Sequence, residues 1–123
     1  MTDVSTIVFE QQGPIGYITL NRPEVMNAFN FDMLQTLSTY VDSIRINPDL
    51  RLVIIQSSGD RAFSVGADLK ERKGLPAPLV IRNLNKFGEV FSNIENLPQP
   101  TICVINGYAF GGGFELALAC DFR

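Results

Sequence analysis

The stretch NGYAFGGGFELALAC, residues 106–120, combines three consecutive glycines with a single carboxylate, Glu115. Gly111, Gly112 and Gly113 have no side chains, so a ligand can approach their backbone closely. A helix that begins at these glycines would present free N–H groups, whose positive potential favours an oxyanion. Beside such a site Glu115 would be a general acid or base. The alternative is a structural carboxylate in a first helical turn, which the helix dipole stabilises by about 0.3–1 kcal/mol.

A second candidate turn lies in AFSVGADLKE, residues 62–71. Asp68 and Glu71 have the three-residue spacing of a capping box, which predicts that a helix begins here. Gly66 and Ala67 precede that helix, so their N–H groups would point outward. If both turns follow neighbouring parallel strands, their amides could jointly bind a developing negative oxygen.

The apolar neighbours of Glu115, from Phe114 to Ala119, predict that its carboxylate lies at the edge of a core with limited access to water. Phosphate binding is the other common role of a glycine-rich turn. Neither G-x-G-x-x-G nor G-x-x-x-x-G-K-[ST] occurs in the sequence, which argues against a nucleotide site.

Length and composition indicate one modest globular domain. The chain has 123 residues, of which 46% are hydrophobic and 19% charged. A net charge of −3 argues against a nucleic-acid partner, because phosphate binding uses clustered Lys and Arg. The sequence contains no histidine, which excludes Ser-His-Asp and Cys-His nucleophilic sites and most zinc sites from this chain. We therefore expect no metal.

Cysteine usage and the N-terminus indicate a cytoplasmic protein. Cys103 and Cys120 lie in apolar segments, which favours two buried, reduced thiols over a disulfide. The N-terminal MTDVSTIVFEQ lacks the basic and apolar regions of a signal peptide. No apolar run is long enough for a membrane span, so we expect no membrane partner.

Hydrophobic patterns predict the elements that position the two turns. The expected strands are Val4–Glu10 and Ile15–Leu20, which form a hairpin, and the buried runs Leu52–Ser58 and Thr101–Asn106. The expected helices are Phe31–Ile46, Val80–Ile94 and a last one from Gly113 to Cys120. This alternation predicts an α/β fold with parallel strands and right-handed crossovers, and residues 73–78, KGLPAP, are the expected mobile loop. The last helix has no following neighbour, so we expect the first part of a longer fold.

Three stretches resemble the crotonase, or enoyl-CoA hydratase/isomerase, superfamily. They are ITLNRPEVMNAFN (18–30), RAFSVGADLKE (61–71) and LPQPTICVINGYAFGGGFELALACDFR (97–123), and their order and separations also match. The resemblance implies a crotonase-like α/β fold of the ClpP/crotonase class, a spiral of repeated ββα units. Residues 1–123 would form the N-terminal part of this domain, with its C-terminal part absent. The full-length protein would be a homo-oligomer, either a trimer or a hexamer.

The resemblance also implies a site and a substrate. The substrate is a coenzyme A thioester, and no further cofactor is needed. In this family two backbone amides polarise the thioester carbonyl, and the matching donors here are the N–H groups of Ala67 and Gly112. Glu115 matches the first of two catalytic glutamates of the hydratases, which add water to 2-trans-enoyl-CoA. The positions matching the acyl-CoA site are Val25, Met26, Ala67, Asp68, Leu69, Lys70 and Gly112.

The sequence departs from the family pattern in three places. The second catalytic glutamate would follow residue 123, so the 123-residue chain alone is expected to lack full hydratase activity. Val65 and Phe114 are larger than the usual family residues, and they either narrow the acyl pocket or pack in the core. Two alternatives stay open: an enoyl-CoA isomerase or other family reaction through the same enolate, and a truncated, non-catalytic acyl-CoA-binding or assembly module.

Overall fold

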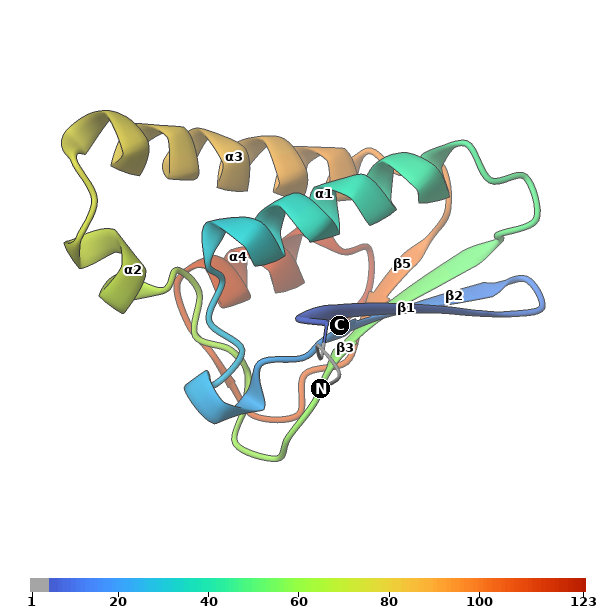
Figure 1. Ribbon diagram of the computed structural model, residues 1–123. Helices are drawn as coiled ribbons and strands as arrows, with labels where there is room; N and C mark the ends of the chain where they lie inside the picture. Colours follow the sequence, from blue (N-terminus) through green and yellow to red (C-terminus); the bar gives the residue numbers. More distant parts are fainter. Residues whose placement is uncertain (1–4) are drawn as a thin grey trace.

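Pairs of strands alternate with helices in residues 5–123, the part of the chain that the computed structural model describes (Figure 1). The elements in chain order are β1 (Ile7–Gln12), β2 (Ile15–Leu20), the 3-10 helix η1 (Pro23–Val25), α1 (Phe31–Arg45), β3 (Leu52–Ser57), β4 (Ala62–Ser64), α2 (Leu69–Lys73), α3 (Ala77–Glu95), β5 (Thr101–Cys103), β6 (Tyr108–Ala109) and α4 (Gly112–Ala119). They form three successive ββα units, the second of which carries two helices. The predicted α/β architecture is confirmed.

The strands form two sheets. The larger has the order β1-β2-β3-β5, in which β1 and β2 form an antiparallel hairpin and the remaining pairs are parallel. The smaller sheet pairs β4 with β6 in parallel. The second and third units therefore each contribute one strand to each sheet. The hairpin prediction is confirmed, although β1 starts at Ile7 and continues to Gln12; Val4 lies outside the described residues.

Helices α1 and α3 lie side by side across the larger sheet (Figure 1). The side chain of Asn30 caps α1 by accepting a hydrogen bond from Met33 N at 2.8 Å. The apolar side chains of α1 recur at three- and four-residue intervals and are buried, among them Leu34, Leu37 and Val41. The prediction of this helix is confirmed.

The predicted buried strand Thr101–Asn106 is wrong in its second half. β5 ends at Cys103, while Val104 and Ile105 are 45% and 43% exposed. Val104 N still donates to Ile55 O at 2.8 Å, after which the chain leaves the larger sheet and leads into β6. The β-branched side chains of Val104 and Ile105 suit a strand, but tertiary structure decides how far a strand pairs with its neighbour.

Helix α3 begins earlier than its apolar pattern predicts. Ala77 and Pro78 form its first turn, so the loop expected over residues 73–78 contains only Gly74, Leu75 and Pro76 between the two helices. Proline is accepted here because the first-turn N–H groups of a helix have no partner within it. None of the helices in residues 5–123 is long and apolar enough to cross a membrane.

Both cysteines are buried and not joined in a disulfide, as predicted. The neighbouring thiol of Cys120 and burial both raise the pKa of Cys103. Because the thiolate is the nucleophilic form, the raised pKa lowers the reactivity of Cys103. The hydrogen bond with Cys103 lowers the pKa of Cys120, but the Cys120 side chain is buried. This leaves the glycine turns and Glu115 as the residues whose placement decides the chemistry.

Candidate active site

The two glycine-containing turns meet. Gly66 and Ala67 follow β4, whereas Gly111 and Gly112 follow β6, its parallel partner. A Cβ atom added to Gly66 would lie 2.6 Å from Gly112 N, so the two backbones are in direct contact. The turns thus follow neighbouring parallel strands as expected, but these strands belong to the smaller sheet.

The N–H groups of Ala67 and Gly112 have no hydrogen-bond acceptor within residues 5–123, whereas the amides around them do. Asp68 N donates to Phe29 O at 2.9 Å and Gly113 N donates to Phe110 O at 2.8 Å. Ala67 and Gly112 line the same cavity, whose volume is about 460 Å³. The fold therefore brings two unused amide donors to one cavity, which is the arrangement that an oxyanion site requires.

Two of the glycines allow this contact. Gly66 has a φ of +91°, a conformation that L side chains rarely adopt. Gly113, in the first turn of α4, lies so close to the Ser64 carbonyl that a Cβ would overlap it. The lack of side chains thus lets the first turn of α4 sit directly against the end of β4.

A buried polar network behind the turns was not predicted from the sequence. Asn27 is 0% exposed, and its Nδ2 donates to Ser58 O at 3.0 Å and to Ala62 O at 3.2 Å. The Ser64 hydroxyl donates to Asn27 O at 2.8 Å and accepts from Gly66 N at 3.1 Å. These bonds hold β4 and the Gly66 turn to the segment before α1. The only sequence signal was a cluster of turn-forming residues around Asn27, which does not reveal partners more than thirty residues away.

Glu115 lies in the first turn of α4 and lines the cavity that Ala67 and Gly112 also line. The prediction that its carboxylate has limited access to water is wrong for the described chain, because Glu115 is exposed. The helical period explains this: Leu116 and Ala117 lie on the face of α4 that packs against the fold, whereas Glu115 lies off it. The apolar neighbours on either side in sequence therefore do not surround it in space.

Asp68 does not line the cavity, but its carboxylate holds the adjacent helix α2 in place. Its Oδ1 accepts from Glu71 N at 3.1 Å, and its Oδ2 pairs with Nη1 of Arg22 at 3.2 Å. The predicted capping box is only half formed, because the Glu71 carboxylate accepts from Phe31 N at 3.0 Å instead of from the Asp68 amide. The two carboxylates thus fix α2 to the start of α1 and to the segment that follows β2.

The remaining predicted acyl-CoA residues occupy different places. Leu69 lines the cavity, whereas Lys70 is exposed and does not. Val25 is 40% exposed, and Met26 borders a separate hollow of about 70 Å³. Their roles in coenzyme binding stay predictions.

Val65 and Phe114, the two residues that are larger than is usual in the family, also differ in their surroundings. Val65 lines the cavity, as a residue that narrows an acyl pocket would. Phe114 is 53% exposed and does not line it, so in residues 5–123 it neither packs in the core nor narrows this cavity.

Replacing Asp68 by Asn is expected to lower the free energy of unfolding by about 1 kcal/mol at pH 7, because the cap survives but the ion pair with Arg22 is lost. Partial burial alone would raise the pKa of the Asp68 carboxyl, but hydrogen bonds from Glu71 N and Arg22 outweigh it, so the pKa lies below its ordinary value. The native protein therefore gains stability above the unfolded pKa of about 3.9 and loses it as the pH falls through the folded value. Urea unfolding of both proteins between pH 7 and 3 tests this; a difference that does not shrink in acid would contradict it.

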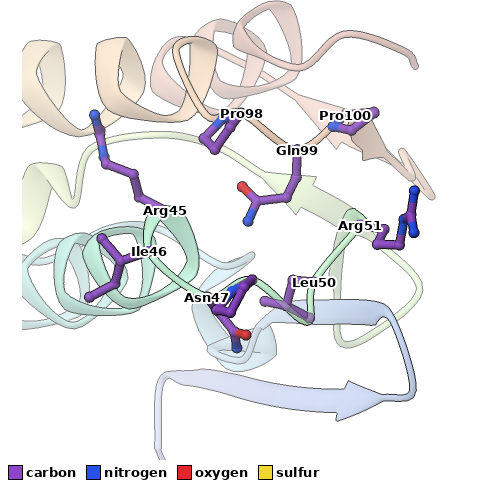
Figure 2. Close-up of a pocket in the computed structure, with 9 residues that line it drawn as sticks. Arg45, Ile46, Asn47, Leu50, Arg51, Pro98, Gln99 and Pro100 are labelled. Carbon is purple, nitrogen blue, oxygen red and sulfur yellow. The ribbon is translucent and has the colours of Figure 1, made fainter.

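A second, larger cavity lies at the amino ends of β3 and β5 in the larger sheet (Figure 2). It has a volume of about 560 Å³, and its lining comes from the segments just before β3 and β5, including Arg51 and Gln99. The Gln99 side chain donates from Nε2 to Ile44 O at 2.7 Å, which satisfies a carbonyl in the last turn of α1. Parallel sheets bind ligands at the carboxyl ends of their strands, whereas this cavity lies at the amino ends. None of its lining residues carries a carboxylate or belongs to either glycine turn. These features argue against this cavity as the active site.

Comparison with known proteins finds relatives along nearly the whole chain. The sequence model of the enoyl-CoA hydratase/isomerase family matches residues 10–123. The protein YngF of Bacillus subtilis is 45% identical over 106 residues, which are 86% of this chain and 41% of YngF. The crotonyl-CoA hydratase of Syntrophomonas wolfei is 39% identical over 118 residues, 95% of this chain and 45% of that enzyme.

Solved structures show the same relationship. The crystal structure of an enoyl-CoA hydratase from Bacillus anthracis superimposes with a TM-score of 0.93 at 38% identity, and the match covers 96% of this chain and 46% of that one. The chain therefore spans less than half the length of these relatives, and its fold is an incomplete crotonase fold. The match over residues 10–123 and the shared fold show that the chain belongs to the enoyl-CoA hydratase/isomerase family of the crotonase superfamily.

Proposed function

We propose that this chain is the N-terminal part of an enoyl-CoA hydratase, which adds water to 2-trans-enoyl-CoA thioesters. The observation that carries the proposal is a cavity lined by Ala67, Gly112 and the carboxylate of Glu115, in which the amides of Ala67 and Gly112 have no acceptor among residues 5–123. The family and the hydratase names of relatives support the same chemistry.

In the proposed reaction the thioester oxygen accepts hydrogen bonds from Ala67 N and Gly112 N. The bonds withdraw electrons from the conjugated double bond and stabilise the enolate that forms when water adds to C3. One such donor contributes about 3 kcal/mol to transition-state stabilisation. Glu115 takes one proton from the attacking water, whose OH group bonds to C3, and a second carboxyl group, expected after residue 123 and protonated at the start, delivers its proton to C2. The product gains one OH and one H, the elements of one water. Transfer of the proton from Glu115 to the second carboxylate then returns both groups to their starting states.

The proposal needs no cofactor, since coenzyme A enters as part of the substrate. Val25, Met26, Asp68, Leu69 and Lys70 are proposed to lie along the bound acyl-CoA. Leu69 lines the cavity, which supports its assignment, whereas those of the other four rest on family resemblance. We also propose a cytoplasmic trimer or hexamer for the full-length protein, on the same basis.

The proposal predicts that the full-length gene product hydrates crotonyl-CoA, which is measured by loss of the absorbance of the enoyl thioester. A polypeptide of residues 1–123 is expected to show no more than background hydration, because it lacks the second carboxylate. A full-length protein with no hydratase activity would overturn the function. Normal turnover by residues 1–123 would overturn the need for the second carboxylate.

A non-catalytic binding or assembly module remains the alternative, and one observation favours it. Large apolar side chains are exposed over the last part of the chain, among them Phe110, Phe114, Leu118 and Phe122. Such surfaces mark interaction sites. The module would bind acyl-CoA without converting it, so calorimetry showing binding by a full-length protein that leaves crotonyl-CoA unchanged would favour this function. Conversion of a 3-enoyl-CoA without hydration would instead favour the isomerase.

A further inference from the structure

The proposed acyl cavity contains a cation. Arg72, in α2, lines this cavity together with Ala67, Gly112 and Glu115. The rest of the wall is mostly apolar and includes Val65, Leu69, Leu84 and Phe87. Arg72 and Glu115 are the charged residues of the lining.

A partly buried guanidinium usually pairs with a carboxylate or another hydrogen-bond acceptor, and Arg72 has no such partner among the described residues. Its Nε is inaccessible to water and has no hydrogen-bond partner within residues 5–123. The ion pairs in this part of the chain are Arg22 with Asp68 and Lys86 with Glu89, so neither Glu115 nor any other described carboxylate pairs with Arg72. A guanidinium stays charged at any physiological pH, and shielding its Nε–H from water without an acceptor costs free energy.

An anionic ligand would supply the missing acceptors. The five N–H donors of a guanidinium match the two oxygens of a carboxylate. Within the cavity one anionic position is already explained, since the amides of Ala67 and Gly112 bind the thioester oxygen in the proposed reaction. Arg72 is a separate, positive group that lines the same cavity and takes no part in binding the thioester oxygen in that reaction.

We propose that Arg72 determines specificity by binding a carboxylate at the far end of the acyl chain, so that the preferred substrates are 2-enoyl-CoA thioesters of dicarboxylic acids. This inference rests on the proposed function for the position of the thioester. It goes beyond it in naming the class of acyl chain. A phosphate of coenzyme A carries the same anionic chemistry, and the experiment separates the two sources.

The test compares crotonyl-CoA with two carboxylated thioesters as substrates of the full-length protein. Crotonyl-CoA and trans-glutaconyl-CoA differ only by a carboxylate on the terminal carbon, and the 2-hexenedioyl thioester extends the chain by one methylene. Wild type is expected to have the higher kcat/KM for one of the carboxylated thioesters. Arg72→Gln is expected to lower that value about 100-fold, as for loss of one partner of a desolvated charge pair, and to leave kcat/KM for crotonyl-CoA within a few-fold. Arg45→Gln is the matched control, because Arg45 is an exposed helical arginine at the opposite end of the sheet, and it should change neither value.

The outcomes are distinguishable. If Arg72→Gln lowered kcat/KM equally for crotonyl-CoA and the carboxylated thioesters, Arg72 would bind the coenzyme phosphates and the inference would be wrong. An unchanged kcat/KM for every substrate would also overturn it. Binding of the saturated thioesters glutaryl-CoA and butyryl-CoA, measured by calorimetry, needs no turnover. A preference for glutaryl-CoA that disappears in Arg72→Gln would support the inference even if hydration itself were not observed, whereas equal binding of both thioesters by wild type would overturn it.

Discussion

Glu115→Gln in the full-length protein is expected to lower kcat for crotonyl-CoA hydration by about 100- to 10,000-fold, the usual contribution of a general acid or base. The amide keeps the size of the side chain but cannot take a proton from water. The free energy of unfolding should change by less than about 0.5 kcal/mol, because Glu115 is exposed and its side chain makes no hydrogen bond within residues 5–123. Stopped-flow or steady-state hydration assays, together with urea unfolding, measure the two effects separately.

The matched control is Glu95→Gln. Glu95 is also exposed, and it borders a neighbouring hollow together with Glu115, but it does not line the cavity that contains the amides. Its replacement should leave kcat unchanged within a few-fold. Comparable losses in the two variants would show that general negative charge near α4 matters rather than the Glu115 carboxylate. Full activity of Glu115→Gln would remove Glu115 from the mechanism.

Gly66→Ala is expected to have the second large effect. It should lower kcat by about 100- to 1,000-fold and the free energy of unfolding by about 1–3 kcal/mol. The methyl group has two costs. The φ of +91° is strained for alanine, and the new Cβ would lie 2.6 Å from Gly112 N. Relieving that contact must separate the turns, which moves one of the two amide donors away from the thioester oxygen.

Gly74→Ala is the control for the second effect. Gly74, at the end of α2, has a φ of −90°, and a Cβ there would lie 3.8 Å from Glu71 O, an ordinary contact. This variant should keep both stability and activity. Raising the substrate concentration to saturation should not restore the turnover rate of Gly66→Ala, because the lost interaction stabilises the transition state. A variant that is merely less stable, with unchanged kcat at low temperature, would show that the Gly66 turn does not position an amide donor.

Helices and the opening hairpin were the most predictable parts of the molecule, because their signals are local. The period of Leu34, Leu37 and Val41 and the cap at Asn30 are enough to place α1. The same local signals misled for Val104 and Ile105, whose side chains suit a strand but are exposed beyond the end of β5.

The candidate site could be predicted only in part. The sequence alone determined the family, the two glycine turns, the cap at Asp68 and the presence of a carboxylate next to the second turn. Only the tertiary structure showed that β4 and β6 pair, so that the turns of Ala67 and Gly112 meet.

Tertiary structure also decided what surrounds each charge. It placed Arg72 in the same cavity as Glu115, with no carboxylate partner among residues 5–123. It also left Glu115 exposed although its neighbours in sequence are apolar. The physical reason is the range of the interactions. Caps and helical periods join residues a few positions apart, whereas the contacts that bring Ala67 and Gly112 together join residues 45 positions apart. No local pattern records which side chains such contacts leave unpaired.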